Sequence, residues 1–439
     1  MPIARTSCSR LEVFRGTHLL RLAFVGLIAT TIARASNAQQ YLTLPVGEAA
    51  KQKKVVVQRC LKDPATYNAS KADFDEYFTK YHFPAMTRTE PDKLGEIGKL
   101  REELFKYFLW KTSDANLQRD LTSLTLAAMK NIVAARNPSC HPAASYNAVL
   151  IIGLLDDQYS PDGRQPPKPS AAGNKTLVFI VDSATTKTLF PPDVILGALI
   201  GLERHAQLHE SLPPEAVAAM QAALLKLVTN DKPIQEMDRD AYAWMRLRAA
   251  SALARLGSVG DKNAVHNAIV QLAVTNKSLD DRCEAASLLD KLVYKNVKLD
   301  DATTAEPLFA LARDIAATEN QRAQDFQDRG TSGAAVTPAY TPGSGMTDPN
   351  AFQRRQTLTR LSNLRTALTT IKTSLPTETQ KKVDAVLAAI NRVITAASGK
   401  ETVDLRLAEM IHAMNDAVNK AVPGPAKPEA DKAKENAVF

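Results

Sequence analysis

The chain has 439 residues, of which 45% are hydrophobic and 23% are charged. This composition excludes an intrinsically disordered chain, and the length is sufficient for two or three compact units. Aromatic residues make up only 6% of the chain, whereas alanine, leucine, lysine and glutamate are plentiful. Because such a mixture favours helices over sheets, we expect an all-α fold.

Residues 1–38 have the features of a secretory signal peptide. Arginines precede an apolar run from Leu19 to Ile32, and small residues follow it in the sequence ARASNA. This run is shorter than the roughly 20 residues needed to cross a bilayer, which favours cleavage over a retained anchor or an amphipathic first helix. We therefore expect a periplasmic or extracellular protein with no stable membrane span after cleavage.

Loss of this segment would remove five arginines and Glu12, which lowers the formal net charge from +8 to +4. This small excess is spread along the chain, so we expect no nucleic-acid partner. The remaining cysteines are Cys60, Cys140 and Cys283. An odd number cannot form a complete disulfide framework, and the sequence is compatible either with one disulfide and one free thiol or with three buried thiols.

Residues 39–137 are predicted to form an N-terminal helical region. Its aromatic cluster, Phe74, Tyr77, Phe78 and Tyr81, recurs at helical spacing. This spacing favours a helix face packed in the core over a platform for stacked bases or for sugars.

Two longer helical patterns follow in the same region. The first starts at Asp92 and carries apolar residues in register, and the second follows a short turn. Ser113 or Asp114 can cap the second helix by accepting hydrogen bonds from its free amides. We expect the two helices to form a hairpin.

Residues 138–329 are predicted to form a series of helical repeats. The stretch YNAVLIIGLLDD places Ala148, Ile151 and Leu154 on one buried stripe of a helix that ends near Asp156. The Pro- and Gly-rich residues 159–175 indicate a surface loop. The following TLVFIV is compatible with an extended segment or with the start of the next helix.

The clearest repeat is the pair WMRLRAASALARLG, which starts at Trp244, and DDRCEAASLLDKLV, which starts at Asp280. A helical unit of this size cannot bury its own apolar face, so it is expected to stack on a neighbouring copy. Small alanines would let the helix backbones come close, and the leucines would fill the seam between them. The alanines concerned are Ala249, Ala250, Ala285 and Ala286.

These residues resemble the second helix of HEAT repeats, which reads Arg, two further positions, Ala-Ala and then spaced leucines. The resemblance implies an irregular α-solenoid in which an Asp six residues before the Arg lies at the turn, and the two residues form a polar ladder between adjacent repeats. Asp240 and Arg246 have this spacing, whereas Asn276 and Arg282 match only in part. The ladder is favoured over a role of these arginines as phosphate or carboxylate receptors. The wider layout is similar to that of exported bacterial HEAT-repeat proteins, which implies no activity.

The composition changes again in the last quarter of the chain. Residues 330–350 are rich in Gly, Ser, Thr and Pro and predict a flexible linker. Three helical patterns within residues 351–421 predict a small three-helix bundle, which we expect to self-associate or to dock separately. Residues 422–439 are charged and contain proline, which predicts a mobile tail.

Few residues in the sequence suggest a catalytic or metal-binding site. His205 and His209 lie one helical turn apart, a spacing that can hold a metal, but no HExxH motif or third ligand accompanies them. Cys140 and His141 are adjacent, which says nothing about a nucleophile and its base, because that pair must meet across space. The sequence therefore predicts no catalytic residue, no cofactor and no metal site.

These observations favour a non-enzymatic scaffold outside the cytoplasm that binds a protein through a curved surface of helical repeats. Two alternatives remain. The first is a hydrolase or lyase whose site is assembled from distant helices, which a deep pocket with perturbed acids would indicate. The second is an envelope-polymer binding protein, whose affinity would fall steeply with salt.

Overall fold

The computed structural model describes residues 40–112, 114–136, 138–160, 164–186, 189–234, 237–331, 351–398 and 404–424. Helices make up 77% of the residues that the structure describes, which confirms the expected all-α class. The only strands among the described residues are β1 (Asp156–Gln158) and β2 (Lys168–Pro169), which form a short antiparallel pair. The predicted signal peptide, most of the predicted linker and most of the predicted tail lie outside the described residues.

The N-terminal region packs short helices around an aromatic core. Phe74, Tyr77 and Phe78 are buried and Tyr81 is partly buried, which confirms the predicted helix face. Asp114 caps α8 by accepting a 2.7 Å hydrogen bond from the backbone N–H of Leu117, as expected. The helices of this region are α2 (Glu48–Lys51), α3 (Lys54–Cys60), α4 (Pro64–Tyr77), η1 (Phe78–His82), α5 (Phe83–Ala85), α6 (Pro91–Leu94), α7 (Ile97–Glu103), η2 (Leu104–Leu109) and α8 (Ala115–Ala134).

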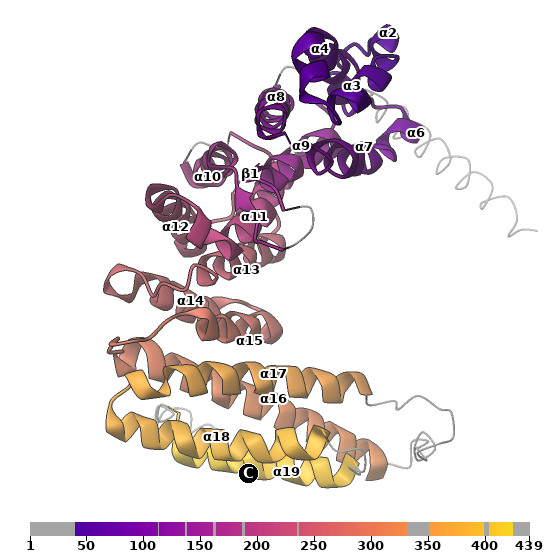
Figure 1. Ribbon diagram of the computed structural model, residues 1–439. Helices are drawn as coiled ribbons and strands as arrows, with labels where there is room; N and C mark the ends of the chain where they lie inside the picture. Colours follow the sequence, from indigo (N-terminus) through magenta and orange to yellow (C-terminus); the bar gives the residue numbers. More distant parts are fainter. Residues whose placement is uncertain are drawn as a thin grey trace, which may run out of the picture.

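The middle of the chain arranges its helices in two layers along an elongated molecule (Figure 1). In one layer α9, α11, α13 and α15 follow one another in contact, and in the other α10, α12 and α14 do so. Consecutive helices also pack across the layers. The elements are α9 (Pro142–Leu154), α10 (Ala171–Thr186), α11 (Pro192–Gln207), η3 (His209–Ser211), α12 (Pro214–Thr229), α13 (Arg239–Ala254), η4 (Asp261–Asn263), α14 (Ala264–Thr275), α15 (Leu279–Ser287), η5 (Leu288–Lys291) and η6 (Asp301–Ala305).

Three details of this region differ from the sequence-based expectations. Leu154 is partly exposed, because it is the last residue of α9 and lies beyond the buried stripe that contains Ala148 and Ile151. The stretch TLVFIV is helical and lies within α10, and the predicted surface loop ends earlier than expected, because residues 171–175 form the first turn of the same helix. Burial on the α10 side that faces α11 and α12 outweighs the local β propensity of these residues.

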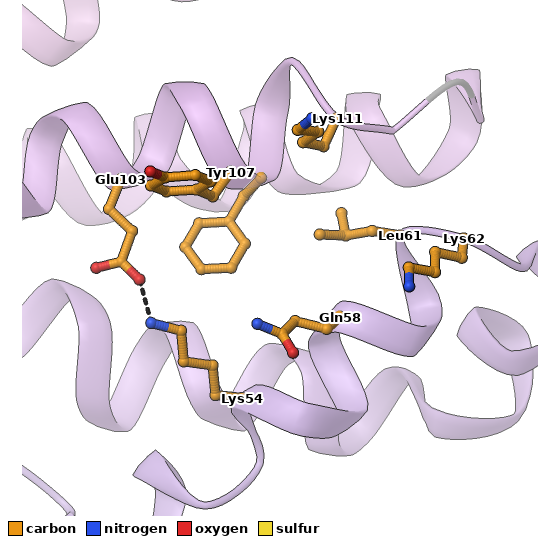
Figure 2. A pocket seen from close by; sticks show the side chains of 8 residues that line it. Lys54, Gln58, Leu61, Lys62, Glu103, Tyr107 and Lys111 are labelled. Carbon is orange, nitrogen blue, oxygen red and sulfur yellow. Dashed lines mark hydrogen bonds and ion pairs between the residues drawn. The ribbon is translucent and has the colours of Figure 1, made fainter.

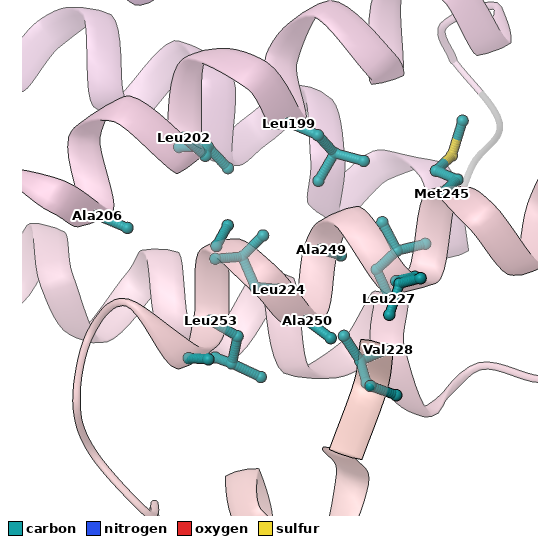
Figure 3. Close-up of a cluster of buried hydrophobic side chains, with 14 of the residues drawn as sticks. Leu199, Leu202, Ala206, Leu224, Leu227, Val228, Met245, Ala249, Ala250 and Leu253 are labelled. Carbon is teal, nitrogen blue, oxygen red and sulfur yellow. The ribbon is translucent and has the colours of Figure 1, made fainter. Parts of the chain in front are cut away.

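The repeated alanines lie where the sequence predicts. Ala249, Ala250, Ala285 and Ala286 are all fully buried. Figure 3 shows Ala249 and Ala250 on α13 among leucine side chains of α11 and α12. Their small side chains let α13 contact both of these helices.

The polar ladder predicted for Asp240 and Arg246 is absent. The guanidinium of Arg246 instead donates two hydrogen bonds, of 2.9 and 2.7 Å, to the carbonyl oxygen of Val228 in the last turn of α12. Asp240 is exposed, and its carboxylate lies 3.8 Å from Lys277. In the second copy Arg282 donates to the carbonyl oxygen of Ala273 in the last turn of α14. The two arginines therefore cap the preceding helix, whose last carbonyl groups have no partner within the helix.

The C-terminal helices pack as a bundle of four. α17 (Ala351–Ile371), α18 (Thr377–Ser398) and α19 (Asp404–Ala421) have the helical character that their patterns predict, with η7 (Lys372–Ser374) between the first two. The long helix α16 (Glu306–Thr331) packs against α19 and α17, so it joins the three predicted helices (Figure 1). α16 also contacts α14, and α17 contacts α15. The bundle thus continues both layers.

Cys60, Cys140 and Cys283 are buried free thiols. Of the two arrangements compatible with the sequence, the structure therefore has three separate thiols and no disulfide between them. Burial raises the pKa of each thiol, which keeps it protonated and weakly reactive.

Candidate functional site

The two histidines that might have held a metal do not face a common site. His205 is fully buried, and its Nδ1 accepts a 3.2 Å hydrogen bond from the side-chain amide of Asn174. His209 lies in η3, where its Nδ1 donates to the carbonyl oxygen of Ala206 at 2.9 Å. No group of three or more His, Cys, Asp or Glu residues in the described part of the chain could hold a metal ion.

Cys140 and His141 are both accounted for by local structure. Cys140 is buried, and burial raises the pKa of its thiol. The imidazole of His141 is the N-cap of α9, where Nδ1 accepts a 3.1 Å hydrogen bond from the backbone N–H of Ala143. His141 is therefore held in a capping role, as its position before Pro142 at the helix start allows.

A surface with a different character lies on the layer that contains α9, α11 and α13. Each of these helices exposes one large apolar side chain: Leu154 is 36% exposed, Ile200 is 38% exposed and Trp244 is 46% exposed. Three arginines accompany them: Arg204 on α11 and Arg248 on α13 are partly exposed, and Arg255, directly after α13, is exposed. We call this surface the α9–α11–α13 face and define it by Leu154, Ile200, Arg204, Trp244, Arg248 and Arg255.

A buried carboxylate fixes two of these arginines. Glu203 of α11 is almost fully buried, and it accepts hydrogen bonds from the guanidinium groups of Arg248 of α13 and of Arg255, which directly follows α13. The hydroxyl of Ser251, between them on α13, donates to the same carboxylate at 3.2 Å. Because several donors share one carboxylate, both guanidinium planes are oriented before any partner arrives.

A second buried carboxylate fixes the third arginine. Arg204 of α11 donates two hydrogen bonds, of 2.8 and 2.9 Å, to Asp156, and a weaker one of 3.3 Å to the carbonyl oxygen of Gly153. Burial raises the pKa of Asp156 to about 6, although the charge of Arg204 acts in the opposite direction. The pair joins the end of α9 to α11, next to the exposed Leu154.

Helical spacing places the apolar and cationic side chains next to each other. Ile200 and Arg204 are four residues apart on α11, and Trp244 and Arg248 are four residues apart on α13. Residues at this spacing are neighbours on a helix surface. The result is a surface of exposed apolar groups beside oriented N–H donors, which is suited to binding.

Sequence reasoning did not identify this face. The repeat pattern draws attention to Arg246, which donates to the last turn of α12. Arg248 and Arg255 instead donate to Glu203 of α11. The available signal was the seven-residue spacing of Arg248 and Arg255, which places them on one side of a helix. Their partner Glu203 is 45 residues earlier than Arg248, and only the packing of α11 on α13 brings them together.

None of the described helices has both the length and the apolar character that a membrane span requires. The chain was compared with family models, with curated proteins and with solved structures, and none of the three comparisons gave a match.

Proposed function

We propose that this chain is an exported, non-enzymatic scaffold that binds a protein partner through the α9–α11–α13 face. In this proposal residues 138–329 form an irregular α-solenoid of degenerate HEAT-like repeats. The two helical layers and the buried alanine seams support the repeat interpretation. The signal-like composition of residues 1–38 supports export.

The composition of the face is the observation that carries the proposal. Tryptophan and arginine dominate the binding energy of protein interfaces when they lie among apolar neighbours. Trp244 and Ile200 are exposed, and the neighbouring guanidinium groups are held in place by buried carboxylates. Because these side chains are already ordered, binding loses less conformational entropy than it would on a flexible surface.

The direct test is site-specific photocrosslinking in the native host. A photoreactive phenylalanine analogue replaces Trp244 in one variant and Phe179 in a control variant. Phe179 is 55% exposed, but it lies on α10 in the other layer. We expect one discrete crosslinked protein from position 244 and none from position 179.

Affinity measurements with the captured protein complete the test. Trp244→Ala should weaken binding by about 30-fold or more, which corresponds to the roughly 2 kcal/mol expected of a hot-spot residue. Phe179→Ala should leave the dissociation constant unchanged. Equal crosslinking from both positions, or unchanged affinity of Trp244→Ala, would contradict the proposed face.

Export is tested separately. Mass spectrometry of protein recovered from the host envelope or medium should find an N-terminal peptide that begins at Gln39. Recovery of the uncut chain from the cytoplasm would contradict export without affecting the binding face. Light scattering of the purified protein would show whether the C-terminal bundle self-associates.

A further inference from the structure

A groove of about 550 Å³ lies in the N-terminal region, at a distance along the chain from the α9–α11–α13 face. It is formed between α3 and η2, and Leu61, Tyr107 and Phe108 contribute apolar groups to its lining. Figure 2 shows Leu61 and Tyr107 on two different helical segments that border the groove. Its volume falls in the range of roughly 300 to 1,000 Å³ that is typical of small-molecule sites. Nothing in the proposed scaffold function uses this groove.

The charges around the groove are unbalanced. Lys54 forms an ion pair with Glu103 across one end of the groove, and Lys62 and Lys111 lie toward the other end (Figure 2). No acidic side chain among the described residues pairs with Lys62 or Lys111, and both are exposed. One end of the groove is therefore electrically neutral, and the other has two uncompensated ammonium groups.

The apolar part of the groove is preformed. Phe108 is buried, and its ring packs edge-on against Phe78 and His82, with centroid distances of 5.1 and 5.6 Å. These contacts belong to the aromatic core of the region, so the ring does not need to be ordered by a ligand. Phe108 has almost no exposed surface left, so a ligand in the groove gains the free energy of burying apolar surface from Leu61, which is partly buried, and from Tyr107, which is 52% exposed.

We propose that this groove binds a small anion with an apolar body, such as an aliphatic carboxylate or an alkyl phosphate. The anionic head lies between Lys62 and Lys111, and the apolar body covers Leu61 and Tyr107 toward the Lys54–Glu103 ion pair. An inorganic anion would leave the apolar surface uncovered, and an uncharged apolar molecule would leave both ammonium groups without a counter-charge. Both parts of the ligand are therefore required.

Tryptophan fluorescence offers a local measurement of binding. The chain has two tryptophans, Trp110 and Trp244. Trp110 directly follows η2 and precedes the lining residue Lys111, and it is the one tryptophan left in a Trp244→Phe variant, so the fluorescence of that variant reports on the neighbourhood of the groove. Purified protein with this substitution is titrated with decanoate and, separately, with decyl phosphate, acetate and 1-decanol, and stoichiometry is measured by calorimetry.

We expect saturable one-to-one binding of decanoate or decyl phosphate, and at least tenfold weaker binding of acetate and 1-decanol. The relative affinities of decanoate and decyl phosphate identify the preferred head group. In the same background, Lys62→Gln with Lys111→Gln should weaken binding of the preferred ligand at least tenfold. A control with Lys99→Gln and Lys295→Gln, which removes two exposed lysines outside the groove lining, should change affinity less than twofold.

A second variant tests the apolar part. Leu61→Asp should abolish binding. A circular dichroism spectrum equal to that of the wild-type protein would show that the variant is folded. The proposal is overturned if neither decanoate nor decyl phosphate saturates, or if the two double-lysine variants bind equally well. Capture of a protein by a photocrosslinker at Tyr107, in the absence of small-molecule binding, would also overturn it and would identify the groove as a protein-binding surface.

Discussion

Two junctions between helices in this molecule are built in opposite ways. α9 and α11 touch through glycines: a Cβ added to Gly153 would lie only 2.6 Å from the Cα of Gly201. The junction of α15, α16 and α17 instead encloses charges, with the carboxylate of Glu319 accepting hydrogen bonds from Arg360 and Thr357. Both junctions are buried, but one depends on the absence of side-chain atoms and the other on a complete set of polar partners.

The two junctions are therefore sensitive to different substitutions: the glycine junction to added side-chain atoms, and the charged junction to the loss of a polar partner. Backbone contact leaves no space, so even one added methyl group must displace a helix. The charged junction has every main partner in place: Arg360 also donates to Asp280 at 2.6 Å, and Gln356 donates to the other oxygen of Asp280. Such a network is stable only while each buried charge keeps its partner.

The largest expected effect is therefore at the charged junction. Arg360→Met leaves Glu319 buried without its main counter-charge, and we expect a loss of about 3 to 5 kcal/mol in the free energy of unfolding. Urea denaturation, with hydrogen exchange to locate the opened helices, measures this effect. In the double variant Arg360→Met with Glu319→Leu most of the loss should disappear, because no unpaired charge remains.

The result would separate two explanations of the junction. If the double variant is as unstable as the single one, the lost packing of the arginine matters more than its charge. Arg365→Met, a partly exposed position on the same helix, is the matched control and should change stability by less than about 0.5 kcal/mol.

At the glycine junction we expect Gly153→Ala to reduce the free energy of unfolding by about 3 kcal/mol, at the upper end of the usual range for overpacking. The atom that the new methyl group meets is backbone, so it cannot move aside as a side chain would. Gly98→Ala is the control: Gly98 also lies inside a helix, but an added Cβ would meet nothing within 4 Å. That substitution should stabilise the protein slightly, because alanine is the better helix former. Equal effects at the two positions would show that close helix contact is not the cause.

Lowering the pH should destabilise the helices before α16 more than the C-terminal bundle. His82, His205 and His266 are buried in the helices before α16, and burial lowers their pKa values to about 4, 3 and 4. In the unfolded chain each has a pKa near 6.5, so between about pH 6.5 and 4 the unfolded state binds more protons and stability falls as the pH falls. A histidine with a folded-state pKa of about 4 contributes a loss of about 2 kcal/mol by pH 5.

Asp156, whose pKa is raised to about 6, has the opposite effect, as do Asp193, Asp281 and Glu284, whose pKa values are also raised by burial. Their gain offsets part of the loss from the three histidines. Hydrogen exchange at pH 7 and pH 5, corrected for the intrinsic exchange rate, should show lost protection in the helices before α16 and smaller changes in the C-terminal bundle. His82→Leu, within its aromatic shell, should reduce the acid sensitivity of the N-terminal helices. Uniform loss of protection along the chain would contradict this assignment.

Features that depend on neighbouring residues could be predicted from the sequence, whereas contacts between distant helices could not. The alanine seam of α13 and α15 was predictable from local sequence. The pair Ala249 and Ala250 recurs as Ala285 and Ala286, and the leucines that follow each pair have helical spacing, which indicates the buried face. The cap at Asp114 was predictable for the same reason, since a helix start needs only a few consecutive residues.

The polar contacts were not predictable from local patterns. Asp280 and Arg360 are separated by 80 residues, and Glu203 and Arg248 by 45. Their meeting depends on the order in which helices pack, which periodicity does not specify. The β-like composition of TLVFIV gave an ambiguous signal for a related reason: a short apolar run fits a strand or a buried helix equally well until its neighbours are known.

The smallest expected changes in stability come from substitutions of the arginines in the repeated stretch. These substitutions test whether the arginines cap a helix or form a polar ladder. If Arg246 acts by capping α12, Arg246→Met should lower the free energy of unfolding by about 1 to 2 kcal/mol, because the carbonyl of the buried Val228 loses its donor. Asp240→Ala should then have no measurable effect, since Asp240 is exposed and does not touch Arg246. A ladder would require the two substitutions to have similar costs.

Arg282 provides an internal check on this assignment. It caps α14 through Ala273 and also forms a 2.8 Å ion pair with Asp314, whose side chain is exposed. Exposed pairs contribute little, so Asp314→Ala should cost less than about 0.5 kcal/mol, whereas Arg282→Met should resemble Arg246→Met. If Asp314→Ala were as costly as Arg282→Met, the surface ion pair rather than the helix cap would account for the contribution of Arg282.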